Sequence, residues 1–308
     1  MNTVLQRQGS FRKALIRDKA LIFLAVPGLL YYLIFCYFPM YGVWMAFTNF
    51  DMSTSIIGSE FVGLKWFKQF FNSYYCGRLI RNTLSISIKS LIFGFSFPII
   101  FALLLNELRN QHYKKIVQTV SYLPHFISTV VIVGILQSLV SAPDGIVNQI
   151  IAFFGGKPIN FMTNPKYFQG LYVLSGVWSS FGWNSIIYIA AIAGIDQQLY
   201  EAATIDGAGH WKQILYVTLP GILPTIMILL IMQLGGIMSV GYEKIILMYN
   251  ASTYETADVI NTYVYRRGLL GGDYSFGAAI GLFNNVINLI LLLTVNYISR
   301  KVTDVALW

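Results

Sequence analysis

The stretch YEAATIDGAGHWKQILYVTLPGILP, Tyr200 to Pro224, begins as a polar segment between two long hydrophobic runs. Gln197 to Ile205 is rich in good helix formers, and Glu201 places a negative charge near the positive end of such a helix. Gly207 then interrupts the pattern, because the backbone there needs either a positive φ or a close approach. The pattern predicts a helix, a turn and a second helix. This helix–turn–helix is physically compatible with two roles, a docking element for a partner or an amphipathic connector on the membrane surface.

The runs on either side of this segment predict an integral membrane protein. The chain has 308 residues, of which 56% are hydrophobic and 11% charged, far fewer charges than an ordinary soluble domain carries. Most of its charge-free runs reach the ~20 residues that cross the hydrocarbon core, and the run beginning at Ser90 does so once residues 83–89 are included. We therefore expect an all-α fold with six transmembrane helices, from the runs Ala20 to Phe50, Ser90 to Asn106, Ile116 to Pro143, Tyr167 to Ile195, Gln213 to Tyr242 and Tyr274 to Ser299.

The distribution of charge indicates orientation rather than nucleic-acid binding. The net charge is +8, but the basic residues are scattered among the loops instead of covering one soluble face. Basic residues are dense only at the N-terminus, which the positive-inside rule places in the cytoplasm next to lipid headgroups. We expect a cytoplasmic tail over 1–19, a permease domain over 20–301 with its loop at 196–220 on the cytoplasmic side, and a cytoplasmic tail over 302–308. The residues on which this orientation depends are Arg7, Arg12, Lys13, Arg17 and Lys19.

Polar side chains inside the hydrophobic runs mark either a pathway or a helix interface. In the last run, Gly277, Gly281, Asn284 and Asn288 share one helical face, with Asn285 at its edge. Such a face can pack against another helix or line a pathway between paired subunits. The glycine-rich run 235–241 predicts an irregular end to the fifth helix. Aromatic rings and amides suit sugar faces and hydroxyls, and the candidate pathway residues are Trp178, Asn184, Tyr188, Gln233, Tyr242, Asn284, Asn285 and Asn288.

Several other residues carry weaker predictions. Lys89, inside the second span, is expected to extend to the outer face or to find a polar partner. His125, beside Pro124 in an expected third helix from about Ile116 to Ser141, is expected to pack or to form a hydrogen bond, because no metal-ligand spacing surrounds it. The only two cysteines, Cys36 and Cys76, predict neither a disulfide nor a metal framework.

No motif for chemistry on this chain is present in the sequence. It contains no GxxxxGK[ST] loop, HExxH, GxSxG or cysteine cluster, and no carboxylate pair suited to a proton or sodium relay. We therefore predict no catalytic residue, no metal site and no enzymatic activity. A stand-alone channel or secondary transporter remains the rival class, and its signs, such as inverted repeats, are not detected.

The segment 200–224 resembles the EAA loop of ABC importer permeases. The matching residues are Glu201, Ala202 and Ala203, then Gly207, then Leu219 with Pro220. The chain from about Ala20 to Lys301 is similar to type I importer permeases of the carbohydrate class. Three later stretches resemble the branch of this class that serves complex oligosaccharides. They are GGIMSVGYEKIILMYN (Gly235 to Asn250), ADVINTYVYRRGL (Ala257 to Leu269) and DYSFGAAIGLFNNVINLILLLTVNYISRK (Asp273 to Lys301).

The resemblance implies a multi-subunit importer in a bacterial cytoplasmic membrane. Its permease subunits pair, here with a chain expected to be different, on two ATPase subunits that hold ATP and magnesium, so that no cofactor binds to this chain. An extracellular sugar-binding protein delivers the oligosaccharide, and alternating access translocates it. A permease for a non-sugar solute is the alternative within the class. The residues implied to contact the ATPase are Glu201, Ala202, Ala203, Asp206, Gly207, Ala208, Leu219 and Pro220.

Overall fold

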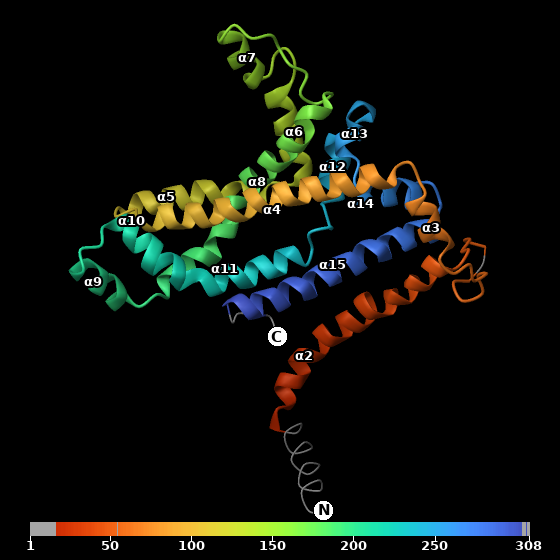
Figure 1. The fold of residues 1–308 in the computed structure, drawn as a ribbon, viewed down its shortest axis with the longest axis horizontal. Helices are drawn as coiled ribbons and strands as arrows, with labels where there is room; N and C mark the ends of the chain where they lie inside the picture. Colours follow the sequence, from red (N-terminus) through yellow and green to blue (C-terminus); the bar gives the residue numbers. More distant parts are fainter. Residues whose placement is uncertain (1–16, 54, 304–305, 307–308) are drawn as a thin grey trace, which may run out of the picture.

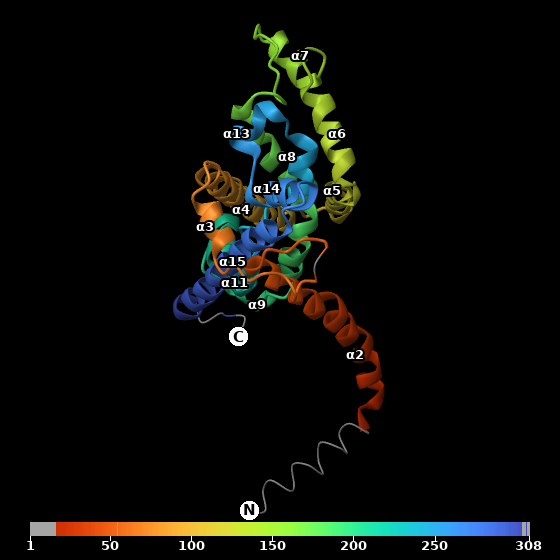
Figure 2. The ribbon, with the colours of Figure 1, turned by 90° about the vertical axis from the view of Figure 1, so that its right-hand side faces the viewer.

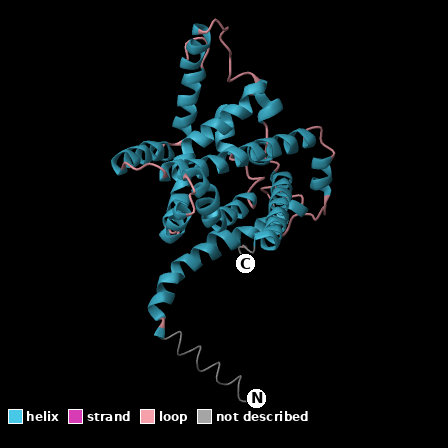
Figure 3. Ribbon diagram, turned by 60° about the vertical axis from the view of Figure 1, so that its left-hand side comes forward, coloured by secondary structure: helices cyan, strands magenta, loops and turns pink. Residues whose placement is uncertain are grey.

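A computed structural model describes residues 17–53, 55–303 and 306. Arg7, Arg12 and Lys13, and most of the tail 302–308, lie outside these described residues. Within the described ranges the regular structure is helical, apart from one isolated antiparallel bridge between Thr48 and Phe61 (Figure 3). The predicted all-α architecture therefore holds for the described part of the chain.

The first span changes its winding along its length. It consists of α2 (Lys19–Tyr31), a π-helical turn (Tyr32–Tyr37) and a 3₁₀ segment (Phe38–Phe47) that begins with Pro39 at its second position. Proline lacks an amide donor, so the hydrogen-bond register must change around it. α2 extends away from the rest of the molecule, and none of its residues, all within the described range, is buried (Figures 1 and 2). Its apolar side chains are therefore free to contact lipid or another subunit.

The centre of the fold is the pair α4 (Cys76–Asn106) and α8 (Pro165–Ala193), which pack along much of their length. α4 begins six residues before the expected start near Asn82 and is preceded by the short α3 (Lys65–Phe71). The extra turns are stabilised by burial, because Cys76, Leu79 and Asn82 are all enclosed. Hydrophobicity alone could not predict this start, since Arg78 and Arg81 interrupt the apolar run.

The expected continuous third helix is wrong. α5 (Gln111–Tyr122) and a 3₁₀ turn (Leu123–Phe126) are separated from α6 (Thr129–Val140), and the two parts meet at a bend of 104°. Pro124 cannot donate within the helix, and Ser128 caps the new start by accepting from the Val131 amide at 3.4 Å. α6 and the following α7 (Ile146–Phe153) project away from the bundle (Figure 2).

The fifth span starts earlier than expected and ends where the glycines predicted. α9 (Gln197–Ile205) is followed by α10 (His210–Gln213), a π-helical turn (Ile214–Thr218) and α11 (Leu219–Leu234). Within the run Gln213 to Tyr242 the sequence places the helix start near Leu223, after Pro220. That start is wrong, because the helix continues from His210 through the π-helical turn, and the changed register just before Pro220 accommodates its missing donor. Residues 235–241 form turns and irregular backbone, as the glycine run predicted.

A chain of short helices leads from there to the last span. These are α12 (Tyr242–Met248), α13 (Tyr254–Ala257) and α14 (Ile260–Tyr263), with 3₁₀ and π turns at Ala251–Thr253 and Val264–Leu270. α15 (Tyr274–Thr303) then runs alongside α11. A Cβ at Gly277 would lie 2.9 Å from the Gly268 Cα, so two glycines allow this close approach.

The number of spans equals the six predicted only when a bent helix pair and a more polar helix are counted with the apolar ones. Four described helices are long and apolar enough to cross a membrane, namely Lys19–Phe47, Cys76–Asn106, His210–Leu234 and Tyr274–Lys301. The bent α5–α6 pair supplies a fifth. α8 is long enough at 29 residues but more polar, with serines and Asn184 along its middle.

Candidate functional site

The segment 196–220, hereafter the Glu201 segment, forms one end of the molecule, where α9 and α10 protrude (Figure 1). α9 begins after Asp196, whose carboxylate accepts from the Gln198 amide at 2.9 Å. The expectation that Glu201 sits at the helix start is therefore wrong, because it is the fifth residue of α9. Asp196 takes the capping role, since its short side chain reaches the free amides of the first turn. Glu201 is left exposed to solvent.

The turn after α9 is built on Gly207. Its φ is +76°, and the Ala208 amide bonds the Ala203 carbonyl at 2.9 Å while the Gly207 amide bonds the Thr204 carbonyl at 3.1 Å. This pair of bonds is the Schellman arrangement that ends many helices. No heavy atom lies within 4 Å of a Cβ built at Gly207. The positive φ, rather than a close backbone approach, is therefore what requires glycine here.

Side chains hold the two halves of the Glu201 segment together. Gln213 donates from Nε2 to Thr204 Oγ1 at 3.0 Å and to the Ala208 carbonyl at 3.1 Å, and the Tyr200 hydroxyl lies 2.9 Å from Thr218 Oγ1. These bonds fix α9 and α10 relative to each other, and the protrusion that the two helices form with the turn between them is called the knob below. Its surface combines the short side chains next to Gly207 with large exposed ones, among them Ile205 at 86% exposed and Trp211 at 73%.

The remaining predicted residues of this segment divide between the surface and the base of the knob. Ala202, Asp206 and Pro220 are exposed, whereas Ala203, Ala208 and Leu219 are half-buried. A cavity of ≈ 520 Å³ separates α9 from the end of α4, and its lining includes Glu107 and Glu201. His210 Nδ1 lies 3.3 Å from Glu107 Oε2 across this region. The knob is therefore in contact with the turn that joins α4 to α5.

A second candidate site is a polar cavity of ≈ 290 Å³ that is open on one side and lined by residues of α4, α8, α11 and α12. Two of the predicted pathway residues, Asn184 and Gln233, meet in its wall. Sequence reasoning missed Lys244, which also lines it, because this residue lies beyond the apolar run. An adjoining cavity of ≈ 240 Å³ shares part of the wall. The cavity of ≈ 290 Å³ is lined by Ser90, Gly94, Tyr172, Val173, Gly176, Val177, Ser179, Ser180, Asn184, Gln233 and Lys244.

The other predicted pathway residues lie elsewhere. Trp178 borders a separate apolar slot against α6, and Tyr188 is buried in an apolar cluster with α4 and α11. Tyr242 is 40% exposed, with its ring 5.7 Å from that of Tyr265. Asn285 is exposed on α15.

Asn284 and Asn288 hold the irregular end of the fifth span. Asn284 donates to the Met238 carbonyl at 3.2 Å, and Asn288 accepts from the Met238 amide at 2.9 Å and donates to Ser239 Oγ at 3.0 Å. Both asparagines are buried. Within this chain they bond backbone that would otherwise lack partners, which is the packing alternative left open by the sequence.

Lys89 and His125 also find partners inside the chain. Lys89 Nζ donates to Gln169 Oε1 on α8 at 2.6 Å. The His125 ring stacks on Trp183, with centroids 4.5 Å apart and planes 2° apart. No group of three or more His, Cys, Asp or Glu side chains that could hold a metal occurs within the described ranges.

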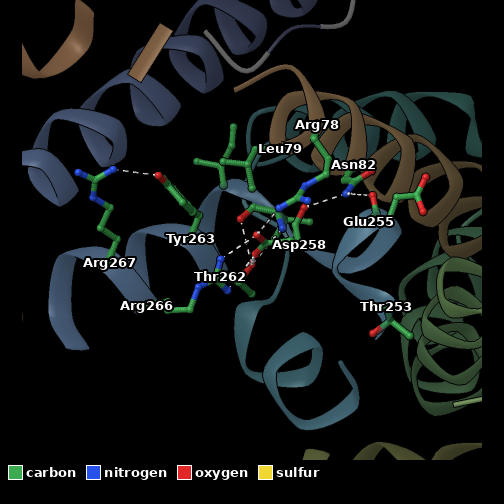
Figure 4. Close-up of polar contacts among 12 residues, drawn as sticks. Arg78, Leu79, Asn82, Thr253, Glu255, Asp258, Thr262, Tyr263, Arg266 and Arg267 are labelled. Carbon is green, nitrogen blue, oxygen red and sulfur yellow. Dashed lines mark hydrogen bonds and ion pairs between the residues drawn. The ribbon is translucent and has the colours of Figure 1, made fainter. Parts of the chain in front are cut away.

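A buried ionic cluster, hereafter the Asp258 network, joins α13–α14 to the start of α4 (Figure 4). The fully buried Asp258 carboxylate accepts from Arg266 Nη2 at 2.8 Å, from Arg78 Nη2 at 3.4 Å and from Thr262 Oγ1 at 2.8 Å. Asn82 Nδ2 adds a bond to the Asp258 carbonyl at 3.0 Å. Burial of the guanidinium opposes its charge, but the hydrogen bonds and charge of Asp258 raise the pKa of Arg266 above its ordinary value. The four-residue spacing of Asp258, Thr262 and Arg266 was a signal for this cluster that the sequence prediction did not use.

Residues 94–304 match the family described as binding-protein-dependent transport system inner membrane component. The chain belongs to this family. It is 41% identical to Protein LplB of Bacillus subtilis (strain 168), over 95% of this chain and 92% of that protein. It is 42% identical to the polygalacturonan/rhamnogalacturonan transport system permease protein YteP of the same organism, over 93% of this chain and 89% of that protein.

A solved structure resembles this inner membrane component over nearly its whole length. A chain in the crystal structure of a bacterial ABC transporter involved in the import of the acidic polysaccharide alginate is 42% identical, with a TM-score of 0.87, over 96% of this chain and 99% of that one. A chain in the crystal structure of a bacterial alginate ABC transporter in complex with an alginate pentasaccharide-bound periplasmic protein gives a TM-score of 0.88 at 42% identity. The predicted family and the type I importer permease fold are therefore confirmed.

Proposed function

We propose that this inner membrane component is one of two permease subunits of an ATP-driven importer that carries an oligosaccharide across the bacterial cytoplasmic membrane. The observation that carries the proposal is the likeness of 96% of the chain, at 42% identity, to a chain of the alginate importer. Relatives named for polygalacturonan or rhamnogalacturonan and, at 30% identity, for arabinooligosaccharides support a sugar polymer as substrate.

The Glu201 segment is the proposed contact with an ATPase subunit, which holds ATP and magnesium. Its rigid turn at Gly207 and its exposed Ile205 support a fixed surface that a cleft in a partner can cover. The contact between His210 and Glu107 offers a route by which movement of this knob reaches α4. Hydrolysis on the ATPase then alternates the access of the cavity between the two sides of the membrane.

The polar cavity is the proposed pathway on this subunit. Asn184, Gln233 and the serines of α4 and α8 can bond sugar hydroxyls, while the second permease subunit closes the open side. An extracellular binding protein delivers the substrate, as the periplasmic protein in the alginate complex suggests. The unburied α2 is the surface of this chain most available to the second permease.

Purification of the tagged chain from its native membrane tests the proposal. We expect an ATPase subunit and a second permease to co-purify, and ATP hydrolysis to rise when the sugar-loaded binding protein is added. Uptake by this chain alone in proteoliposomes would favour a stand-alone transporter. Hydrolysis that responds only to a non-sugar solute would support a permease for another substrate.

Accessibility of Gly209 tests the orientation. Gly209 is exposed next to α10, so a Gly209→Cys variant of a chain whose native cysteines are replaced offers one reactive thiol. We expect an impermeant thiol reagent to label inverted membrane vesicles but not intact cells, because the basic N-terminus favours the cytoplasm. A cysteine at Gly272, beyond an odd number of spans from Gly209, is the matched control and should give the reverse pattern. Labelling of Gly209→Cys in intact cells would contradict the proposed topology.

A further inference from the structure

Two lysines approach the same face of α8 close to the polar cavity. Lys89 on α4 bonds Gln169, and Lys244 on α12 bonds the Tyr172 carbonyl at 2.8 Å. Gln169 and Tyr172 are three residues apart on α8, hence about one helical turn. Positive charges therefore line up along α8, beginning near its first turn and continuing into the cavity wall.

Lys244 is the deeper of the two and is closely held. Its side chain is half-buried, its ammonium lies 4.7 Å from the centroid of the Tyr172 ring, and a Cβ built at Gly176 would be 3.3 Å from Nζ. Glycine at 176 thus leaves the room that the ammonium occupies. The amides of Asn184 and Gln233 share the same cavity wall.

Neither ammonium has an anionic partner. Among the described residues, no carboxylate lies within 4.0 Å of Lys89 Nζ or Lys244 Nζ, and the recorded acceptors are a neutral amide oxygen and a backbone carbonyl. Elsewhere in this protein the buried charge of Asp258 is fully paired. A partly buried cation without a counter-charge is costly, and it lines a cavity that is large enough for a ligand.

We propose that the transported oligosaccharide is acidic, and that Lys244 binds its carboxylate groups in the cavity while Lys89 contacts them nearer the first turn of α8. The inference rests on the proposed importer function and adds the substrate class to it. A uronate carboxylate supplies the missing counter-charge, and Asn184 and Gln233 remain for the neighbouring hydroxyls. Charge-assisted bonds are about twice as strong as neutral ones, so they give discrimination against neutral sugars.

The test uses the complete importer in proteoliposomes with its binding protein. The probes are trisaccharides of galacturonate, mannuronate and glucuronate, each paired with its carboxyl-reduced neutral counterpart. We expect at least one acidic probe to be imported and its neutral counterpart to be imported poorly. Loss of one charge-assisted bond predicts that Lys244→Gln lowers uptake of that acidic probe about tenfold or more, and Lys89→Gln lowers it less.

One further measurement on Lys244→Gln and two further variants separate charge recognition from a structural role. Lys244→Gln keeps a donor for the Tyr172 carbonyl, so the amount of assembled complex should match that of the parent. Lys244→Arg restores the charge and should recover most of the uptake. Lys157→Gln removes an exposed charge between α7 and α8 and is the matched control, which should import like the parent.

Two results overturn the inference. One is uptake of the acidic probe by Lys244→Gln at the parent's rate. The other is a parent importer that responds to no acidic probe. If that importer still moves neutral trisaccharides, the proposed function stands and only the acidic substrate class is contradicted. If the chain shows no response to any sugar and no ATPase partner, both the proposed function and the acidic substrate class are contradicted.

Discussion

The Glu201 segment and the Asp258 network both lie in connections between spans, yet they treat charge in opposite ways. In the Asp258 network the carboxylate is fully buried and every one of its close contacts is a donor from this chain. In the Glu201 segment Glu201 and Asp206 face solvent, and Ile205 is exposed beside them. In the first arrangement the carboxylate finds its partners within one chain. The second has a defined shape and an uncovered surface, which is what a docking element needs.

Removing the carboxylate from the Asp258 network should have the largest effect. Asp258→Ala leaves the guanidinium groups of Arg78 and Arg266 facing each other without an anion, and breaking a buried pair in this way costs about 3–5 kcal/mol. Because folded proteins are only marginally stable, we expect little folded protein in the membrane and a clear fall in Tm after solubilisation. Size-exclusion chromatography and thermal unfolding in detergent measure both.

The matched control for that change is Asp273→Ala. Asp273 also pairs with an arginine, Arg267, at 2.8 Å, but its side chain is 48% exposed. An exposed pair contributes about 0–1 kcal/mol, so the Tm should barely move. If both variants lost the same stability, burial of Asp258 would not explain the difference between the two regions.

Gly207→Arg should break the docking surface and leave the fold intact. The positive φ makes any side chain there cost about 1 kcal/mol or more, and the bulky cation stands where a partner must fit closely. We expect normal amounts of membrane-inserted protein that no longer retains the ATPase subunit, or retains it without sugar-stimulated hydrolysis. Co-purification and hydrolysis assays against the parent decide this.

Gly209→Arg adds the same side chain two residues later, where φ is −71° and no strain arises. Retention of the ATPase by Gly209→Arg but not by Gly207→Arg would locate the contact on the α9 side of the turn. Full retention and full stimulation with Gly207→Arg would reduce the Glu201 segment to a surface connector.

The smallest effects should come from single charges on α9. Asp196→Ala removes the cap and costs about 1 kcal/mol, whereas Glu201→Ala removes an exposed mid-helix charge and should cost only a few tenths. Hydrogen exchange of the α9 amides should therefore accelerate several-fold in Asp196→Ala and hardly change in Glu201→Ala. The opposite order would restore Glu201 as the residue that stabilises the helix start.

Periodicity and composition predicted what depends on local sequence. The turn at Gly207, the irregular run after Leu234 and the apolar spans follow from backbone preference and hydrophobicity, which neighbours along the chain determine. The break near Pro124 has a local cause, the proline itself. Proline in a membrane helix can either kink the helix or end it, and which of the two occurs depends on the packing of neighbouring helices. The clustering of Asp258 with Arg78 joins residues 180 positions apart, and no pattern in one sequence fixes such a pairing.

The candidate cavity shows the same limit. Asn184 and Gln233 were predicted from their residue types and do meet in one wall. Trp178 and Tyr188 have suitable chemistry as well, but Trp178 faces α6, and Tyr188 is buried in an apolar cluster with α4 and α11, outside the cavity lining. The sequence prediction omitted Lys244 because this residue follows the apolar run, and only the fold of α12 places it beside α8.

The two bonds that α15 makes to Met238 also determine which parts of the molecule can move separately. Asn284 bonds the carbonyl of Met238 and Asn288 bonds its amide, so two successive peptide units of the segment after α11 are held by α15. Sliding or rotation between these two elements would release both bonds inside the protein, where water cannot replace them. We therefore expect α15 and the segment after α11 to shift together when access to the cavity changes.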